Sequence, residues 1–326
     1  MKKVMKTAVS KLLAFFLLPM IAYGVFAILR PRAFLNAEVP VTILNQCLSN
    51  IVLAWGMSFS MMIGNMDFSC VAERILGAIL GITLCNLIGP IGLVIGVFAV
   101  ALVVGAAKAV LAIAMDIKNR VVTIAYTLVL GSLGYFVTGG DTSVIRVDMG
   151  PFREKWFCIL LFVLFGVIMY FLNRYSMFGA QCRALAGNEA LALSSGIKKR
   201  RVESIATMVC SLYIAASALL TVSRGGGATP QSGLTSMSAV FSAMSGVFIA
   251  NALGKYLSQP IGIIVGNYTM SLIIYGLVAC NLPTQLTTTV NGGFLMIILL
   301  FMEIKDKLDS EKQRKEAVRR NLSYGL

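Results

Sequence analysis

Long apolar stretches separated by short polar breaks dominate the chain. A membrane helix needs about 20 predominantly apolar residues, and ten stretches come near that length. They lie at residues 12–29, 42–63, 71–89, 91–115, 121–137, 156–173, 202–222, 235–253, 256–280 and 289–303. The stretches at 121–137 and 289–303 are short, which favours a tilted or partial crossing there. The pattern predicts an all-α membrane protein with about ten transmembrane helices.

The basic residues between these stretches indicate the orientation. With the N-terminus in the cytoplasm, 21 of the 28 Lys and Arg residues fall on the cytoplasmic side, as the positive-inside rule requires. An even number of crossings leaves both basic termini inside. We therefore expect a transmembrane domain over 1–304 in the inner membrane. A cytoplasmic loop at 174–201 lies within it, and a basic cytoplasmic tail follows at 305–326.

Composition narrows the class of function. Hydrophobic residues make up 58% of the 326 residues and charged residues only 13%, whereas a soluble domain has roughly 25% charged residues. The formal net charge of +14 gathers at the chain ends and in one central loop, so we expect no nucleic-acid partner. The chain has no His, the commonest general base and metal ligand. We therefore expect no catalytic residues, no metal and no cofactor.

The loop at 174–201 carries the signals of a short helix. Asn188 is a good N-cap, Glu189 puts a negative charge in the first turn, and Gly196 can end the helix. The predicted helix has roughly seven residues and is about 10 Å long. It is either a docking element for a cytoplasmic partner or an ordinary connector, and the helix signals favour neither.

The sequence of this loop, AGNEALALSSGI at 186–197, resembles the cytoplasmic loop of the ribose-type ABC permeases. That family includes permeases for ribose, xylose, galactose, inositol and autoinducer-2. Three further segments resemble the family in the same order: IGNMDFSCV at 63–71, IAYTLVLGSLGYFVTGG at 124–140 and SRGGGATPQSG at 223–233. The resemblance implies the fold of a type II ABC importer permease. Such a subunit would translocate a small polar solute, here a sugar, with energy from a separate ATPase.

The resemblance also implies partners and coupling residues. The partners are an ABC ATPase, an extracytoplasmic solute-binding protein, a second permease as homodimer or heterodimer, and membrane lipid. The chain has no G-x-x-x-x-G-K-[ST] loop of its own, so ATP hydrolysis falls to the separate subunit. The residues implied to contact the ATPase are Arg183, Gly187, Asn188, Glu189, Ala190, Ser195, Gly196 and Ile197.

Some segments depart from the family. Thr235, Ser236 and Met237 stand where an acidic residue is usual, and Glu73 and Arg74 replace small residues. These departures leave the solute open, and a nucleoside or amino-acid permease remains an alternative. The outer loop at 138–155 is either a docking site or a solvated connection.

Polar residues near the crossings are candidates for the transport path. Gln46 and Asn50 are four residues apart and share a helix face, where their amides can bind sugar hydroxyls or tie helices together. The resemblance adds Asn65, Asp67 and Ser69 as residues near the path.

Four charged residues also fall near predicted helix ends. Asp67, Glu73, Arg74 and Lys108 lie close to the cytoplasmic side, and we expect structural roles for them, with Lys108 snorkelling to the interface. An ion-coupled secondary transporter, the alternative class, usually holds an acidic residue at mid-membrane. The predicted crossings have none at their centres.

Small residues predict close packing of the helices. Gly77-x-x-x-Gly81 and Gly92-x-x-x-Gly96 are spaced to let neighbouring helices approach. Residues 63–81 and 250–266 form a loose internal repeat, in which a small polar break precedes a Gly-spaced apolar run.

Overall fold

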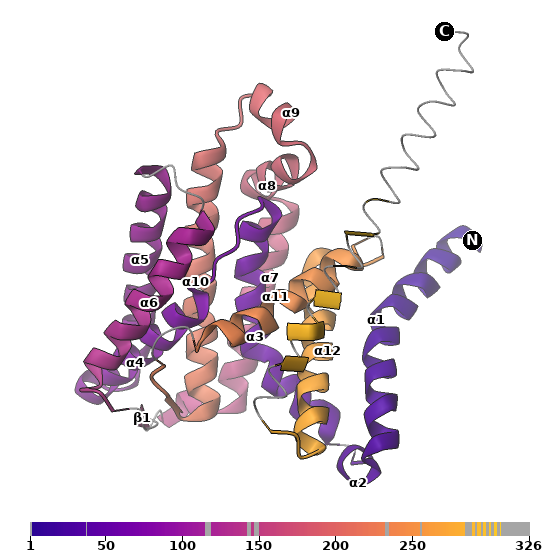
Figure 1. Ribbon diagram of the computed structural model, residues 1–326, viewed down its shortest axis with the longest axis horizontal. Coiled ribbons are helices and arrows are strands. Elements are labelled where there is room, and N and C mark those ends of the chain that lie inside the picture. The colour runs from indigo at the N-terminus through magenta and orange to yellow at the C-terminus, as the bar shows by residue number, and fades with distance from the viewer. Residues whose placement is uncertain are drawn as a thin grey trace.

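The protein is almost entirely helical in a computed structural model (Figure 1). The structure describes residues 2–36, 38–114, 119–141, 145–146, 150–231, 235–254 and 256–283, with scattered positions between 289 and 307. The elements are α1 (Lys2–Leu29), α2 (Pro31–Phe34), α3 (Val39–Met62), α4 (Cys70–Ile88), α5 (Pro90–Ala114), α6 (Asn119–Val137), β1 (Ile145–Arg146), a 3₁₀ turn (Gly150–Arg153), α7 (Lys155–Arg174), α8 (Met177–Gly187), α9 (Glu189–Ser194), α10 (Lys199–Gly225), β2 (Gly227–Ala228), α11 (Met237–Ala252) and α12 (Gln259–Ala279). The predicted all-α class is confirmed, with one short antiparallel strand pair, β1–β2, added to it.

Helices overlap nine of the ten predicted crossings, and in the tenth, 289–303, the structure describes scattered positions, which are helical. Six helices are long and apolar enough to cross a membrane: α3, α4, α5, α7, α10 and α12. Three apolar helical segments are shorter, at Phe15–Leu29, Val121–Val137 and Met237–Ala252. The chain is thus a multi-pass membrane protein, but the count of ten full crossings is not confirmed. In particular α11, predicted to cross fully, has 16 residues and is only about 24 Å long, less than the hydrocarbon core of about 30 Å.

Helices α3 and α10 pack at the centre of the bundle. Gly56 permits their contact, since a Cβ atom there would lie 2.5 Å from Cβ of Tyr213. Two buried aromatic side chains then fix the pair to its neighbours. The Tyr213 hydroxyl donates to the carbonyl of Phe165 in α7, and Trp55 Nε1 donates to the carbonyl of Pro260 in α12, both at 3.1 Å. These bonds satisfy polar atoms that would be costly to bury alone.

Glycines bring two further helix pairs together. A Cβ atom on Gly96 of α5 would lie 2.7 Å from Cα of Gly81 in α4, so the predicted Gly-spaced packing is confirmed here. A Cβ atom on Gly266 of α12 would lie 2.4 Å from the carbonyl oxygen of Gly246 in α11. The two halves of the loose repeat, 63–81 and 250–266, therefore each supply one glycine to a close helix pair.

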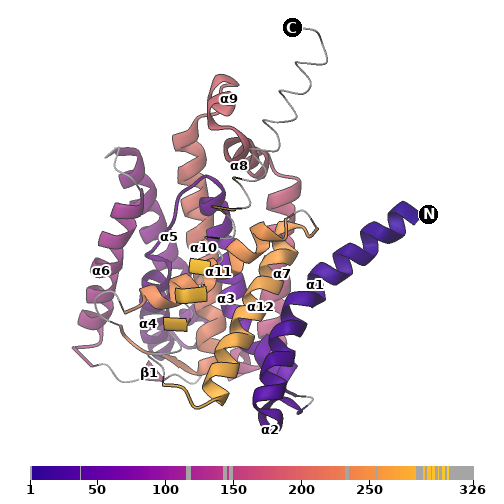
Figure 2. The same cartoon turned by 45° about the vertical axis from the view of Figure 1, so that its right-hand side comes forward.

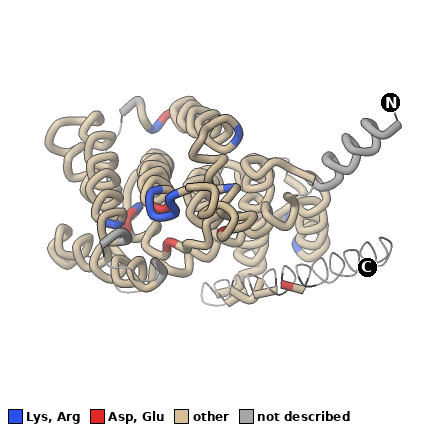
Figure 3. The backbone as a smooth tube through the Cα atoms, turned by 90° about the horizontal axis from the view of Figure 1, so that it is seen from above, with Lys and Arg blue, Asp and Glu red and all other residues tan. Residues whose placement is uncertain are grey.

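The outer surface of the bundle is apolar. Helix α7 alone exposes Trp156, Ile159, Leu160, Val163, Leu164 and Val167. Figure 3 views the bundle along the helices, and few charged positions interrupt the tan tube. Contiguous apolar surface of this extent suits contact with lipid rather than water.

The connection from α3 to α4 turns back into the bundle. Cys70, the first residue of α4, lies beside Met57, with 3.5 Å between their sulfur atoms. Met57 precedes the end of α3 at Met62 by about 7.5 Å along the helix axis. Figures 1 and 2 show the connection leaving α3 at the end that carries α9 and running inward before α4 begins. Asp67 and Ser69 are consequently buried inside the bundle.

Candidate functional site

A helical extension, α8 and α9, projects from one end of the bundle (Figure 1). The sequence predicted α9, and the structure adds α8 to it within the 174–201 loop. Helix α8 begins at the N-cap Ser176, whose hydroxyl accepts a hydrogen bond from the Gly179 amide at 3.0 Å. Cys182 of α8 is buried, which raises the pKa of its thiol to about 11. Ser176 is an N-cap signal that was present in the sequence, but the sequence analysis did not use it to predict α8.

Helix α9 is confirmed as a short capped helix. Asn188 Oδ1 accepts a hydrogen bond from the Leu191 amide at 3.1 Å. Gly196 ends the turn with φ of +85°, a backbone conformation that favours glycine. The Glu189 carboxylate pairs with Lys199 Nζ at 2.6 Å, which links the first turn of α9 to the first turn of α10.

The predicted coupling residues divide into two groups. Ser195, Gly196 and Ile197 line a groove of about 530 Å³ between the α9–α10 turn and one face of α8. The groove is also lined by Met177, Ala180, Gln181, Ala184, Lys198, Arg201 and Val202. The others lie outside it. Arg183 bonds to the carbonyl and the side chain of Asn173 at the end of α7, Gly187 ends α8, and Ala190 is exposed on α9.

Two exposed leucines were missed by sequence reasoning. Leu191 is 64% exposed and Leu193 is 46% exposed, although both belong to a six-residue helix at the tip of the extension. Ala192 between them is buried. Leucines exposed on a capped helix beside an open groove are typical of a surface that binds another protein.

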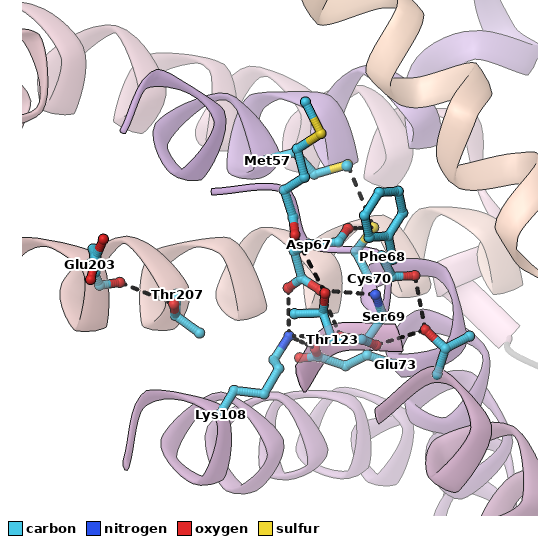
Figure 4. A network of polar contacts seen from close by, with 12 residues as sticks. Met57, Asp67, Phe68, Ser69, Cys70, Glu73, Lys108, Thr123, Glu203 and Thr207 are labelled. Carbon is cyan, nitrogen blue, oxygen red and sulfur yellow. Dashed lines mark hydrogen bonds and ion pairs between the residues drawn. The ribbon is translucent and has the colours of Figure 1, made fainter. Parts of the chain in front are cut away.

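A buried ionic cluster lies where the α3–α4 connection meets α5 (Figure 4). Lys108 Nζ lies 2.8 Å from Asp67 Oδ2 and 2.6 Å from Glu73 Oε2. The Ser69 hydroxyl and amide both donate to Asp67 Oδ1, at 2.7 and 2.9 Å. Exposure of Asp67, Glu73 and Lys108 is between 1% and 4%.

This cluster corrects the expectation for Lys108. Lys108 does not snorkel to the interface; it turns inward because two carboxylates meet it there. The acidic residues lie inside the bundle, since the connection that carries Asp67 runs back into it. Both carboxylates are already paired with Lys108, so the cluster joins the connection, α4 and α5.

The remaining predicted path residues lie on α3 and the connection. Asn50 is half-buried at the middle of α3, and its Oδ1 accepts a hydrogen bond from Arg74 Nη1 at 3.1 Å. Gln46 is exposed one turn away, so the two amides do not play one common packing role. Asn65 is half-buried, and its backbone amide bonds to the Ser60 carbonyl. The structure therefore brings Asp67 and Ser69 together, and separately Asn50 and Arg74.

The similarity of this chain to known proteins covers both the α8–α9 extension and the buried ionic cluster. Residues 39–300 match the family described as branched-chain amino acid transport system / permease component. The chain is similar to the L-arabinose ABC transporter permease protein of Azospirillum brasilense, with 24% identity over 287 residues, 84% of this chain and 80% of the relative. It is also similar to the xylose transport system permease protein of Haemophilus influenzae, with 24% identity over 150 residues, 46% of this chain and 39% of the relative. The family match spans the α8–α9 extension, the ionic cluster and Arg74.

Proposed function

The chain belongs to the family of branched-chain amino acid transport system permease components, and on that premise we propose that it is the membrane-spanning subunit of an ABC importer for a sugar. Members of such families are transport subunits that work with an ATPase and a solute-binding protein. The names of the arabinose and xylose relatives support a sugar as solute. The proposal extends to an inner-membrane location, with the α9 end and both termini in the cytoplasm, and to pairing with a second permease.

The α8–α9 extension is the observation that carries this proposal. It offers a capped helix, exposed leucines and an open groove on one end of an otherwise lipid-compatible bundle. With that end in the cytoplasm, an ATPase would bind α9 and the groove. Coupling residues Ser195, Gly196 and Ile197 then line the contact, whereas Arg183 and Asn188 hold the extension in shape.

The contacts of the extension suggest how movement would pass into the bundle. Arg183 ties α8 to the end of α7, and Glu189 ties α9 to the start of α10. Helix α10 in turn packs against α3 through Tyr213 and Gly56. A rigid shift of the extension on ATPase closure would therefore move α7 and α10 against α3 and change access to the path.

Purification from the native membrane tests the proposal. The tagged chain would be crosslinked mildly, isolated, and its partners identified by mass spectrometry. We expect an ATPase and a solute-binding protein, and crosslinked permease pairs. Recovery of intact protein with neither partner would contradict the proposal. Uptake that collapses with an ionophore while ATP is maintained would contradict it as well, because an ion gradient would then supply the energy.

A further inference from the structure

Arg74 is a cation without an acidic partner in the described part of the bundle. Its Nη1 donates to Asn50 Oδ1 at 3.1 Å and reaches Ser217 Oγ at 3.5 Å. Ser217 is held in turn by its own bond to the Ser49 carbonyl, at 2.7 Å. Both partners of Arg74 are neutral, and the described residues place no carboxylate within 4.0 Å of it. The neighbouring Glu73 faces Lys108 on α5 instead, about 100° away around α4.

Arg74 lies at the level of the middle of two membrane-crossing helices, α3 and α10. Asn50 lies at the middle of α3 (Val39–Met62), and Ser217 lies within the membrane-crossing part of α10. Arg74 and Asn50 are half-buried, and Gln46 is exposed one turn along α3. A surface with an arginine and two amides at this depth would be costly in lipid. It therefore faces away from lipid.

The free donors at this surface match a carboxylate with neighbouring hydroxyls. Both hydrogen bonds of Arg74 use Nη1, so Nε and Nη2 keep their donors free of partners among the described residues. A guanidinium presents such nitrogens in a fork that fits a carboxylate. Asn50 uses its oxygen on Arg74, which leaves its amide nitrogen to donate to a hydroxyl, as Gln46 also can.

A second arginine lies farther along α10. Arg224 is exposed in the last turn of α10. It follows Ser217 by seven residues, about two turns, so the two residues lie on the same face of the helix. The proposed orientation puts this end outside. A solute entering from there would meet Arg224 first and Arg74 at mid-depth. A cation such as Arg74, without an acidic partner among the described residues, favours an anion over a neutral solute in a medium of low dielectric constant.

We propose that the transported solute is a sugar acid, and that Arg74, with the amides of Asn50 and Gln46, binds its carboxylate in the middle of the path. The inference rests on the proposed permease function and names the substrate class of that function.

Matched sugars test the substrate class. Binding to the solute-binding protein that co-purifies with the chain would be measured by calorimetry for D-galactose against D-galacturonate, D-glucose against D-glucuronate, and D-xylose against D-xylonate. We expect at least tenfold tighter binding of the acid in one pair. Preference for the neutral member, or binding of no member, would overturn the sugar-acid assignment.

Variants of the reconstituted complex test the role of Arg74. ATP-driven uptake of the preferred solute should fall at least tenfold in Arg74→Gln, and less in Arg74→Lys, which keeps the charge. Gln46→Ala, at an exposed position, should reduce uptake severalfold. Arg32→Gln, which changes an exposed arginine of α2, is the matched control and should leave uptake unchanged.

The solute-independent ATPase rate of each complex checks that the variants are folded and assembled. Wild-type uptake by Arg74→Gln would overturn the role of Arg74. If the proposed permease function itself is wrong, the uptake result differs from both of these cases, because no sugar of any pair would be taken up with ATP. ATP-driven uptake of a neutral sugar that is insensitive to Arg74→Gln would leave the permease function standing and refute only the anion site.

Discussion

Glu73 and Lys108, on adjacent helices and 35 residues apart in the chain, form a 2.6 Å ion pair with only 1% and 2% of their side chains exposed. The same ammonium also holds Asp67 at 2.8 Å. One lysine thus fixes the connection that turns back into the bundle and the first turn of α4. Since Arg74 follows Glu73 directly, this cluster also sets the rotation of α4 that points Arg74 toward α3 and α10.

Lys108→Met should destabilise the protein by about 3 kcal/mol or more, because it leaves two buried carboxylates without their cation. Unfolding by SDS in mixed micelles, followed by tryptophan fluorescence, measures the change. Lys155→Met, at an exposed position, is the control and should change stability by no more than about 0.5 kcal/mol. The neutral triple variant Asp67→Asn, Glu73→Gln, Lys108→Met should recover much of the loss. Wild-type stability of Lys108→Met would contradict a structural role for the cluster.

The sequence predicted the membrane fold well, because apolar length and basic loops depend on local composition. The short helix α9 was also predictable, since Asn188, Glu189 and Gly196 are local capping signals. The path of the α3–α4 connection was not predictable. A segment rich in polar and small residues reads as a surface turn, and only Lys108, some 40 residues later, provides the charge that draws Asp67 inward. The role of Arg74 was hidden for the same reason, because its partners lie on α3 and α10.

Gly96→Leu should destabilise the α4–α5 pair by about 2 kcal/mol, the typical cost of forcing extra atoms into a packed contact. A Cβ atom at Gly96 already lies 2.7 Å from Cα of Gly81, and backbone atoms cannot yield as a side chain can. Gly24→Leu is the matched control, because no atom lies within 4 Å of a Cβ atom there. The same unfolding assay compares the two. Equal stability of both variants would show that α4 and α5 do not pack at Gly81 and Gly96.

Glu189→Lys should weaken ATPase association about tenfold, measured by co-purification at increasing salt. It reverses a charge in the first turn of α9, which disfavours the helix. It also replaces the ion pair with Lys199 by two positive charges that repel each other. The exposed Glu189–Lys199 pair contributes at most about 1 kcal/mol within the chain. The charge swap Glu189→Lys, Lys199→Glu separates the two roles. If Glu189 contacts the ATPase, the swap will not restore association; full restoration would assign Glu189 to the internal pair alone.

Asn188→Ala should destabilise α9 by about 1 kcal/mol, because the helix loses its N-cap hydrogen bond. ATPase association should therefore weaken about fivefold. Asn188→Asp keeps an acceptor for the Leu191 amide and should bind nearly as the wild type does. Binding of the purified ATPase to the reconstituted permease, measured by interferometry, gives both values. If the two variants lose affinity equally, the Asn188 side chain contacts the ATPase directly and is not acting as a cap.

Leu191→Asn should reduce ATPase affinity about tenfold. Leu191 is 64% exposed on the proposed docking helix and would become buried on association. Central apolar side chains carry much of the binding energy of an interface. Folding of the permease should not change, since the side chain has little contact with its own chain. Leu35→Asn is the matched control: Leu35 is 77% exposed but lies beside α2, at the opposite end of the bundle. The same binding assay applies to both variants. Equal affinities would place the ATPase contact away from α9, whereas a loss confined to Leu191→Asn would assign the contact to the tip of the extension.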